Sequence, residues 1–141
     1  MPVWRLAREA HAALDGEGAR IFGGRWNSPG RPMIYTASSA ALAVLEVRVH
    51  LDLPLDMAPR DFQLMSTELG DMGIEDLPTG GADDPLSFGD RWLREGRSPA
   101  IRVPSFIVPE EWNLLVNPLH PAARGIKVVS RRPFRFDPRL F

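Results

Sequence analysis

The 141-residue sequence contains no cysteine. A disulfide framework, a thiolate zinc site and a cysteine nucleophile are therefore excluded. No apolar run approaches the ~18 residues of a membrane-spanning helix, so we expect no membrane association. The first residues, MPVWRLAREAHAAL, lack the basic stretch followed by an apolar stretch that is typical of a secretory signal. We therefore expect a cytoplasmic protein.

Motifs for several common kinds of site are also missing. The three histidines, His11, His50 and His120, are scattered and form no H-x-x-x-H pair, so no metal site is expected. The sequence has neither a phosphate-binding loop nor a G-x-G-x-x-G that follows a strand. Ser105 lacks a G-x-S-x-G setting, so it is not predicted to be a nucleophile. We expect neither a metal nor a resident cofactor.

Charge is unevenly distributed along a chain whose net charge is −1. Residues 61–90 carry eight acids and no lysine or arginine, whereas residues 124–139 carry six basic residues and one acid. A basic segment can contact nucleic acid. Because the total is nearly neutral, a solvated strand pair or a face for an acidic protein partner is the preferred interpretation, and no direct contact with nucleic acid is expected.

The pattern of elements predicts an α+β fold in a single compact domain, residues 1–141, with mixed short-stranded sheets and two or three helices. Residues 15–32 hold five glycines and two prolines and are expected to form a long functional loop, and residues 70–84 an acidic loop. Helices are expected at residues 7–14, from Ser38 or Ser39 to about His50, and from Pro85 to Gly96. Strands are expected at residues 3–6, 33–36, 63–69, 100–109 with a central break, 113–118, and a hairpin of 126–130 with 133–137.

One carboxylate interrupts the apolar helix that is expected to end near His50. Glu46 lies at the edge of an apolar stripe, and valines cover other faces, so we expect the helix to be buried. A buried carboxylate must be paired or hydrogen-bonded. Glu46 is therefore either an acid at the floor of a pocket or the partner of an arginine in a structural ion pair. The arginines considered as partners are Arg5, Arg25 and Arg48.

Three further residues could carry chemistry. Arg25 lies in GGRWN, where glycines allow a ligand to approach the backbone, and arginine can grip phosphate or carboxylate with two hydrogen bonds. The alternative for Arg25 is an ion pair that fixes the loop. Tyr35, the only tyrosine, either belongs to the core or stacks on a planar ring with its hydroxyl free. Ser105 lies at a break between strands, where serines are usually turn residues.

Four blocks cover almost the whole chain, namely VWRL, GEGARIFGGRWNSPGRPMIYTA, ALAVLEV and GDRWLREGRSPAIRVPSFIVPEEWNLLVNPLHP. Together they closely resemble the RES domain family, which is named for an arginine, a glutamate and a serine. The name-giving residues correspond to Arg25, Glu46 and Ser105. Tyr35 matches the family's pocket tyrosine, and Arg5 matches an early arginine that is associated with the pocket. Asn117 and His120 match an N-P-x-H-P block, which we interpret as structural.

The resemblance implies a fold like that of ADP-ribosyltransferases and the activity of a type II toxin from a bacterial toxin–antitoxin pair. Such toxins break the nicotinamide–ribose bond of NAD⁺, which is a substrate and not a cofactor, and pass ADP-ribose to water, to inorganic phosphate or, in some members, to a protein. The implied partner is an antitoxin with a helix-turn-helix, Xre-like DNA-binding domain that blocks the pocket. A homodimer within the antitoxin complex is compatible with this reading.

The resemblance also implies a role for each matched residue. Glu46 would stabilise an oxocarbenium-like centre, and Arg25 and Arg5 would hold the pyrophosphate. Tyr35 would stack on nicotinamide or ribose, and Ser105 would make one positioning hydrogen bond.

Three other functions stay open from the residues alone. The first is a protein ADP-ribosyltransferase with a specific target, which shares the NAD⁺ site and differs only in the acceptor. The second is a ribonuclease toxin that uses the basic C-terminal segment to hold RNA. The third is an interaction module without activity, in which a Glu46–Arg25 pair is structural.

Overall fold

A single mixed sheet organises residues 2–78 and 81–141, which are the residues that the computed structural model describes. Within these residues the sheet has seven strands, and neighbouring strands are antiparallel except for β4 and β5. In spatial order the strands are β4 (Ile74–Asp76), β5 (Ala100–Pro104), β6 (Trp112–Val116), β2 (Ile34–Ala37), β1 (Val3–Arg8), β3 (Phe62–Glu68) and β7 (Lys127–Phe134).

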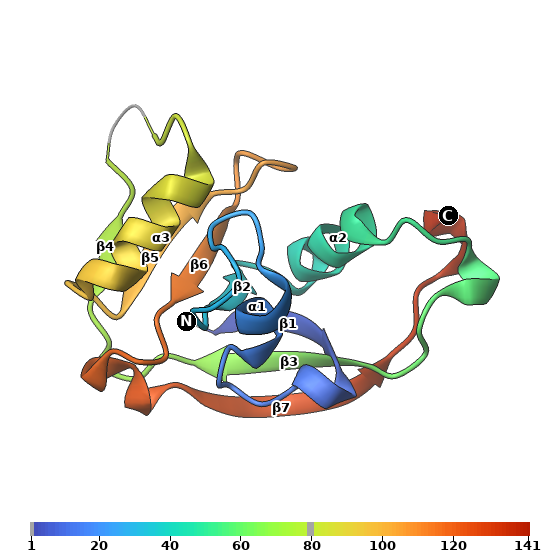
Figure 1. Cartoon of the computed structure of the whole chain (residues 1–141). Coiled ribbons are helices and arrows are strands. Elements are labelled where there is room, and N and C mark those ends of the chain that lie inside the picture. The colour runs from blue at the N-terminus through green and yellow to red at the C-terminus, as the bar shows by residue number, and fades with distance from the viewer. Residues whose placement is uncertain (1, 79–80) are drawn as a thin grey trace.

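The described residues also form three α-helices, which lie apart from one another around the sheet. They are α1 (Glu17–Phe22), α2 (Ala40–His50) and α3 (Pro85–Glu95). Short 3₁₀ helices are η1 (Glu9–His11), η2 (Leu55–Met57), η3 (Pro121–Gly125) and η4 (Pro138–Leu140). Figure 1 shows α3 beside β4 and β5, α2 toward the opposite side, and the segment with α1 between them. The predicted α+β class is confirmed, although one sheet replaces the several that we expected.

The boundaries of the two longer helices follow local signals in the sequence. Ser39 precedes α2, and its hydroxyl accepts a hydrogen bond from the backbone N–H of Leu42 at 3.1 Å, which caps the helix. Pro85 occupies the first turn of α3, and Gly96 ends it with a φ of 60°, a conformation that glycine adopts without strain. Both predicted helices are therefore confirmed.

Two predictions for the N-terminal segment are wrong. The predicted helix at 7–14 is absent from the described chain: β1 continues to Arg8 and only η1 follows, because every residue of β1 pairs with β3. The predicted loop at 15–32 contains α1, which has six residues between Gly16 and Gly23, both at positive φ. A helix of six residues is too short to give a periodic apolar pattern.

Three predictions for the other segments also need correction. Residues 106–109 form a turn, because the Ser105 hydroxyl accepts the N–H groups that a strand would give to its neighbour. The predicted loop 70–84 contains the short edge strand β4. The predicted C-terminal hairpin is one continuous strand, β7, which pairs along β3. Pro133 does not break β7 because an edge strand tolerates a residue without an N–H.

The predicted burial of α2 on all sides is wrong. Only Leu42 and Ala43 of this helix are buried, and Val49 is 57% exposed. The reason is that the middle of α2 borders a cavity instead of a second layer of the protein. In the described part of the chain no helix has the length and apolar character needed to cross a bilayer.

Candidate functional site

A cavity of about 640 Å³ lies between α2, the loop that precedes β2, and the strands β1, β2 and β6. This volume falls in the range of small-molecule sites. Arg5, Arg25, Tyr35 and Glu46 all line the cavity, so the fold brings together four of the five predicted site residues. Ser105 does not line it and lies behind Glu46.

Glu46 is held by a serine and not by an arginine. Ser105 is only 2% exposed, and its hydroxyl donates a hydrogen bond to Oε1 of Glu46 at 2.9 Å. Among the described residues Glu46 forms no ion pair, so the structural ion pair considered from the sequence is not present there. The carboxylate therefore keeps its negative charge unneutralised at the wall of the cavity, where it can face a developing positive charge.

Arg25 lines the cavity from the loop formed by residues 23–26 and contacts an aromatic ring. Its guanidinium carbon lies 4.2 Å from the centre of the Phe106 ring, which is a cation–π geometry. The ring of Trp26 is 6.2 Å from that of Phe106. In the described chain Arg25 makes neither an ion pair nor a side-chain hydrogen bond, so the alternative of a loop-fixing ion pair is also not found there.

The hydroxyl of Tyr35 is hydrogen-bonded to the loop that carries Arg25. The free hydroxyl that we considered from the sequence is therefore not found. The hydroxyl accepts a hydrogen bond from the backbone N–H of Trp26 at 3.0 Å and donates one to Oδ1 of Asn27 at 2.6 Å. Gly24 packs directly against it, since a Cβ at this position would lie 2.5 Å from the hydroxyl oxygen. Only the ring of Tyr35 therefore remains to contact a ligand in the cavity.

Asn27 is the centre of the polar network beneath this loop. Its side chain is 1% exposed and is hydrogen-bonded at both ends. The amide nitrogen shares its two hydrogens among three backbone carbonyls, those of Ala19 (2.9 Å), Ser28 (3.2 Å) and Arg31 (3.3 Å). The network ties α1 and the turn before β2 to the segment that carries Arg25.

Helix α3 holds the same loop from the other side. Asp90 accepts hydrogen bonds from the backbone N–H of Ser28 at 2.8 Å and from its hydroxyl at 2.6 Å. Gly89 lies so close to the loop that a Cβ there would be 1.7 Å from the carbonyl oxygen of Trp26. Glycine is therefore required at position 89 by the close approach of backbone to backbone.

Arg5 is tied to the protein by backbone groups and not by an acid. Its guanidinium donates to the carbonyl oxygens of His11 at 2.7 Å and Ala12 at 3.2 Å. Burial lowers the pKa of Arg5 from its ordinary value, and the more distant charge of Asp15 partly opposes this effect. No carboxylate in the described residues forms an ion pair with Arg5, so an anionic ligand would supply the missing negative charge.

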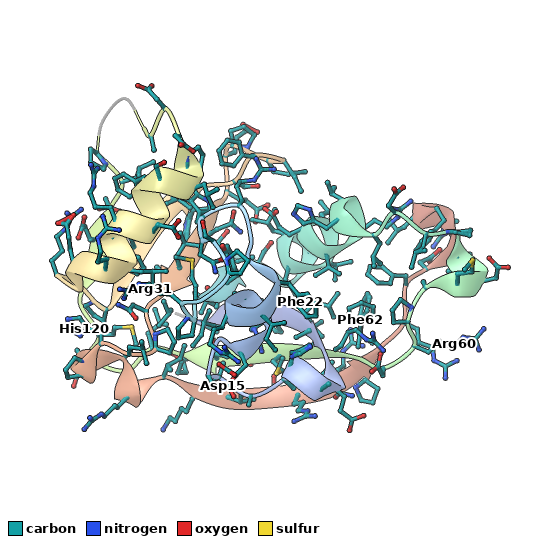
Figure 2. All side chains as sticks on the ribbon, in the orientation of Figure 1. Asp15, Phe22, Arg31, Arg60, Phe62 and His120 are labelled. Atoms are coloured by element: carbon teal, nitrogen blue, oxygen red, sulfur yellow. The ribbon has the colours of Figure 1, made fainter. Side chains whose placement is uncertain are left out.

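Asn117 and His120 lie outside the cavity. Oδ1 of Asn117 accepts the N–H of Leu119 at 3.1 Å, and Nδ1 of His120 accepts the N–H of Ala122 at 3.0 Å at the start of η3. Figure 2 shows His120 at the opposite side of the view from Phe62, which lines the cavity. The contacts fit the structural role that we assigned to this block.

Sequence reasoning missed four residues that shape the site, namely Asn27, Gly89, Asp90 and Phe106. Their importance depends on contacts between segments far apart in the chain, and none belongs to a general motif. Asn27 could have been identified from the sequence, because it directly follows GGRW in the loop that we expected to be functional. In the described residues no group of three or more potential ligands is placed to hold a metal ion.

The pKa of Tyr35 gives a direct test of this geometry. Burial raises it from 10.0 to about 12, while the hydrogen bond from the N–H of Trp26 opposes the rise. Because the folded state holds this proton more tightly, the contribution to stability is complete below pH 10 and is lost as the pH rises to about 12. Tyr35 is the only tyrosine, so the tyrosinate absorbance of the folded chain should titrate near 12. A midpoint equal to that of the denatured chain would contradict a buried hydroxyl.

The chain is similar to several known toxins. A model of the RES domain matches residues 2–137. A protein named Prs ADP-ribosylating toxin from Sphingobium sp. (strain YBL2) is 44% identical over 154 residues, which cover 97% of this chain and 94% of that protein. A protein named Toxin Res from Yersinia enterocolitica is 39% identical over 153 residues, which cover 99% of each chain.

More distant similarity extends to mycobacterial proteins. A protein named NAD(+) phosphorylase MbcT from Mycobacterium bovis is 35% identical over 91 residues, 57% of this chain and 49% of that protein. The crystal structure of the M. tuberculosis MbcT–MbcA toxin–antitoxin complex has a TM-score of 0.74 at 23% identity, over 99% of this chain and 85% of that chain, and shows the same fold. The RES domain model matches almost the whole chain, and Toxin Res is 39% identical over almost its full length. The chain therefore belongs to the RES domain family.

Proposed function

We propose that this chain is the toxin of a toxin–antitoxin pair and that it cleaves the nicotinamide–ribose bond of NAD⁺ in the cytoplasm. The observation that carries the proposal is the unneutralised carboxylate of Glu46, which is fixed by Ser105 at the wall of a cavity of about 640 Å³. The relatives named NAD(+) phosphorylase and ADP-ribosylating toxin support it. Phosphorolysis of NAD⁺ and ADP-ribosylation share one step, the rupture of this bond, and differ in the acceptor.

Glu46 would act by electrostatic stabilisation. As the bond between C1′ of the ribose and the nicotinamide nitrogen breaks, its electron pair leaves with nicotinamide and positive charge develops on the ribose. A fixed carboxylate stabilises such an oxocarbenium-like centre. An acceptor oxygen then bonds to C1′ and releases its proton to solution. Because nicotinamide leaves as a neutral molecule, no second carboxylic acid is needed, and the reaction uses NAD⁺ as a substrate without a resident cofactor or metal.

Two arginines would bind the pyrophosphate of NAD⁺. Arg5 and Arg25 both line the cavity, and neither is neutralised by an acid among the described residues. A pyrophosphate is therefore favoured over a neutral ligand, since it would restore the charge balance around Arg5 in particular. The ring of Tyr35 would pack against nicotinamide or ribose, while its hydroxyl keeps its contacts to the arginine loop.

An antitoxin would inhibit the toxin by covering this cavity. The similar fold in the MbcT–MbcA toxin–antitoxin complex supports a protein partner of this kind. A helix-turn-helix, Xre-like domain in that partner, and a homodimer of the toxin within the complex, belong to the same proposal on the strength of the family resemblance.

Transfer of ADP-ribose to a protein is a second candidate for the same site. The observation that favours it is the 44% identity, over almost the whole chain, to the Prs ADP-ribosylating toxin. Both candidates require NAD⁺ cleavage that depends on Glu46, and they differ only in which molecule receives the ribosyl group.

The test is NAD⁺ consumption by the purified chain without antitoxin, with and without inorganic phosphate and with a bacterial extract as a source of protein acceptors. We expect release of nicotinamide. The mass of the product then identifies the acceptor as water, phosphate or a protein. Failure of a folded sample to release nicotinamide under all three conditions would contradict the proposal and favour the ribonuclease alternative, which RNA cleavage would reveal.

A further inference from the structure

The turn between β5 and β6 is fixed to the carboxylate of the site by one hydroxyl group. The Ser105 oxygen accepts the backbone N–H groups of Ile107 and Val108, each at 3.1 Å, and donates to Glu46 at 2.9 Å. A serine hydroxyl offers one donor and two acceptor positions, so all of its hydrogen-bonding capacity is used. The turn and the carboxylate therefore form one unit, and Ser105 has no remaining position for a ligand.

Phe106 is the next residue of this turn, and its large apolar side chain is exposed beside the cavity. It is 54% exposed, yet its backbone lies between residues that the Ser105 hydroxyl holds in place. It also lines the cavity. An exposed aromatic ring beside a cavity is available for a functional contact, and this ring lies against the guanidinium of Arg25 at 4.2 Å and near the ring of Trp26 at 6.2 Å.

Contact through the face of the guanidinium leaves its edges available. Arginine carries its five N–H donors in the plane of the group, and stacking on a ring does not consume them. The guanidinium carbon of Arg25 lies over the Phe106 ring at 4.2 Å, and Arg25 donates no side-chain hydrogen bond within the described residues. Phe106 therefore holds Arg25 in place while its donors stay available for an anion.

We propose that Phe106 is a positioning residue that holds Arg25 for the diphosphate of the substrate. The proposal rests on the proposed function and extends it. The turn between β5 and β6 then positions both the carboxylate that faces the ribose and the arginine that faces the diphosphate. Ser105 places the carboxylate for the ribose, and Phe106 places the arginine for the diphosphate. Phe106 thus acts on binding through Arg25 and contributes no group to bond cleavage.

The expected effect concerns ligands that carry a diphosphate. Replacing Phe106 with alanine removes the cation–π contact and should weaken the binding of ADP by roughly 3- to 10-fold. Binding of adenosine, which has no phosphate, should not change. Phe106→Trp should restore the affinity for ADP, since tryptophan offers a cation–π face of equal or greater strength. In NAD⁺ cleavage, Phe106→Ala should raise KM and leave kcat nearly unchanged.

The experiment is titration calorimetry of ADP and adenosine with the wild-type chain, Phe106→Ala, Phe106→Trp, Arg25→Ala and the double variant of Phe106 and Arg25. Phe22→Ala is the matched control, because Phe22 is 72% exposed on α1 and does not line the cavity. Figure 2 labels this control residue. In the Arg25→Ala background, Phe106→Ala should have no further effect on ADP binding.

Two results would overturn the proposal, and they separate it from the proposed function. If the wild-type chain binds ADP and Phe106→Ala binds it equally well, or if the loss persists in the Arg25→Ala background, the role of Phe106 is wrong and the NAD⁺ site stands. If the wild-type chain does not bind ADP, the diphosphate site is wrong and the role of Phe106 falls with it, whereas the proposed NAD⁺ cleavage fails only if a folded sample releases no nicotinamide.

Discussion

Replacing Glu46 with glutamine is expected to slow NAD⁺ cleavage by about 10²- to 10³-fold, which is the usual cost of losing a group that stabilises charge in the transition state. Glutamine keeps the size of the side chain and can still accept the hydrogen bond from Ser105. The fold and the binding of ADP should therefore stay intact, and the loss should appear in kcat. Growth inhibition in cells without antitoxin should disappear with it.

The matched control for this variant is Glu110→Gln. Glu110 is an exposed acid on the same connection between β5 and β6, and it lies outside the cavity, so its loss changes the net charge equally without touching the site. We expect normal cleavage by this control. A Glu46→Gln chain that is folded and cleaves NAD⁺ within about 3-fold of the wild type would rule out transition-state stabilisation by this carboxylate.

Ser105→Ala tests how much of the effect of Glu46 depends on the orientation of its carboxylate, since the variant leaves the charge in place. The variant keeps Glu46 but removes the hydrogen bond that orients it and the acceptor for two backbone N–H groups. We expect a smaller loss of kcat than for Glu46→Gln, together with lower thermal stability, since the partly buried N–H groups of Ile107 and Val108 lose their acceptor. The comparison tests whether orientation or charge dominates.

Local signals in the sequence were sufficient for some elements and insufficient for others. Ser39, Pro85 and Gly96 define helix ends through contacts within a few residues, and the predicted α2 and α3 have these ends. In contrast, α1 and β4 are too short to show periodicity, and β7 is continuous only because β3 pairs along it. The strand order places β1 between β2 and β3 and could not be derived from hydrophobic patterning.

The residues of the candidate site could be identified, but their partners could not. Glu46 and Ser105 are 59 positions apart, and Ser28 and Asp90 are 62 positions apart. Such contacts follow from the order of the strands, so the sequence left open whether Glu46 is a pocket acid or the partner of an arginine, and it could not show that a buried serine holds the carboxylate. The hydroxyl of Tyr35 was missed for the same reason, since its partner Asn27 lies beneath a loop whose path depends on α3.

The backbone of the loop that carries Arg25 is held at three places, two of which share the side chain of Asn27, and this gives an exposed arginine a defined backbone position. Asn27 anchors it to α1, Tyr35 anchors it to β2, and Asp90 anchors it to α3. Each support uses a hydrogen bond to the backbone or to a buried amide, and none uses the side chain of Arg25. The guanidinium instead contacts the ring of Phe106. Its donors remain available to a ligand for that reason.

Asn27→Ala is expected to have the largest effect on stability among the substitutions in this loop. The change leaves the hydroxyl of Tyr35 without its acceptor and removes the amide donor from the carbonyls of Ser28 and Arg31, whereas the carbonyl of Ala19 keeps the N–H of Gly23. Since each buried polar group without a partner costs about 1–3 kcal/mol, we expect the free energy of unfolding to fall by about 3 kcal/mol or more. For a chain of this length the melting temperature should then fall by roughly 10 °C.

Asn113→Ala is the matched control for stability, because the Asn113 side chain makes a single hydrogen bond of 3.3 Å, to the carbonyl oxygen of Thr36. Its loss should cost about 1 kcal/mol or less. Thermal unfolding of the two variants, followed by circular dichroism, measures the difference. Equal melting temperatures would show that Asn27 does not anchor the loop. The expected difference would instead show that a buried amide outside the cavity stabilises the fold through the loop whose backbone carries Arg25.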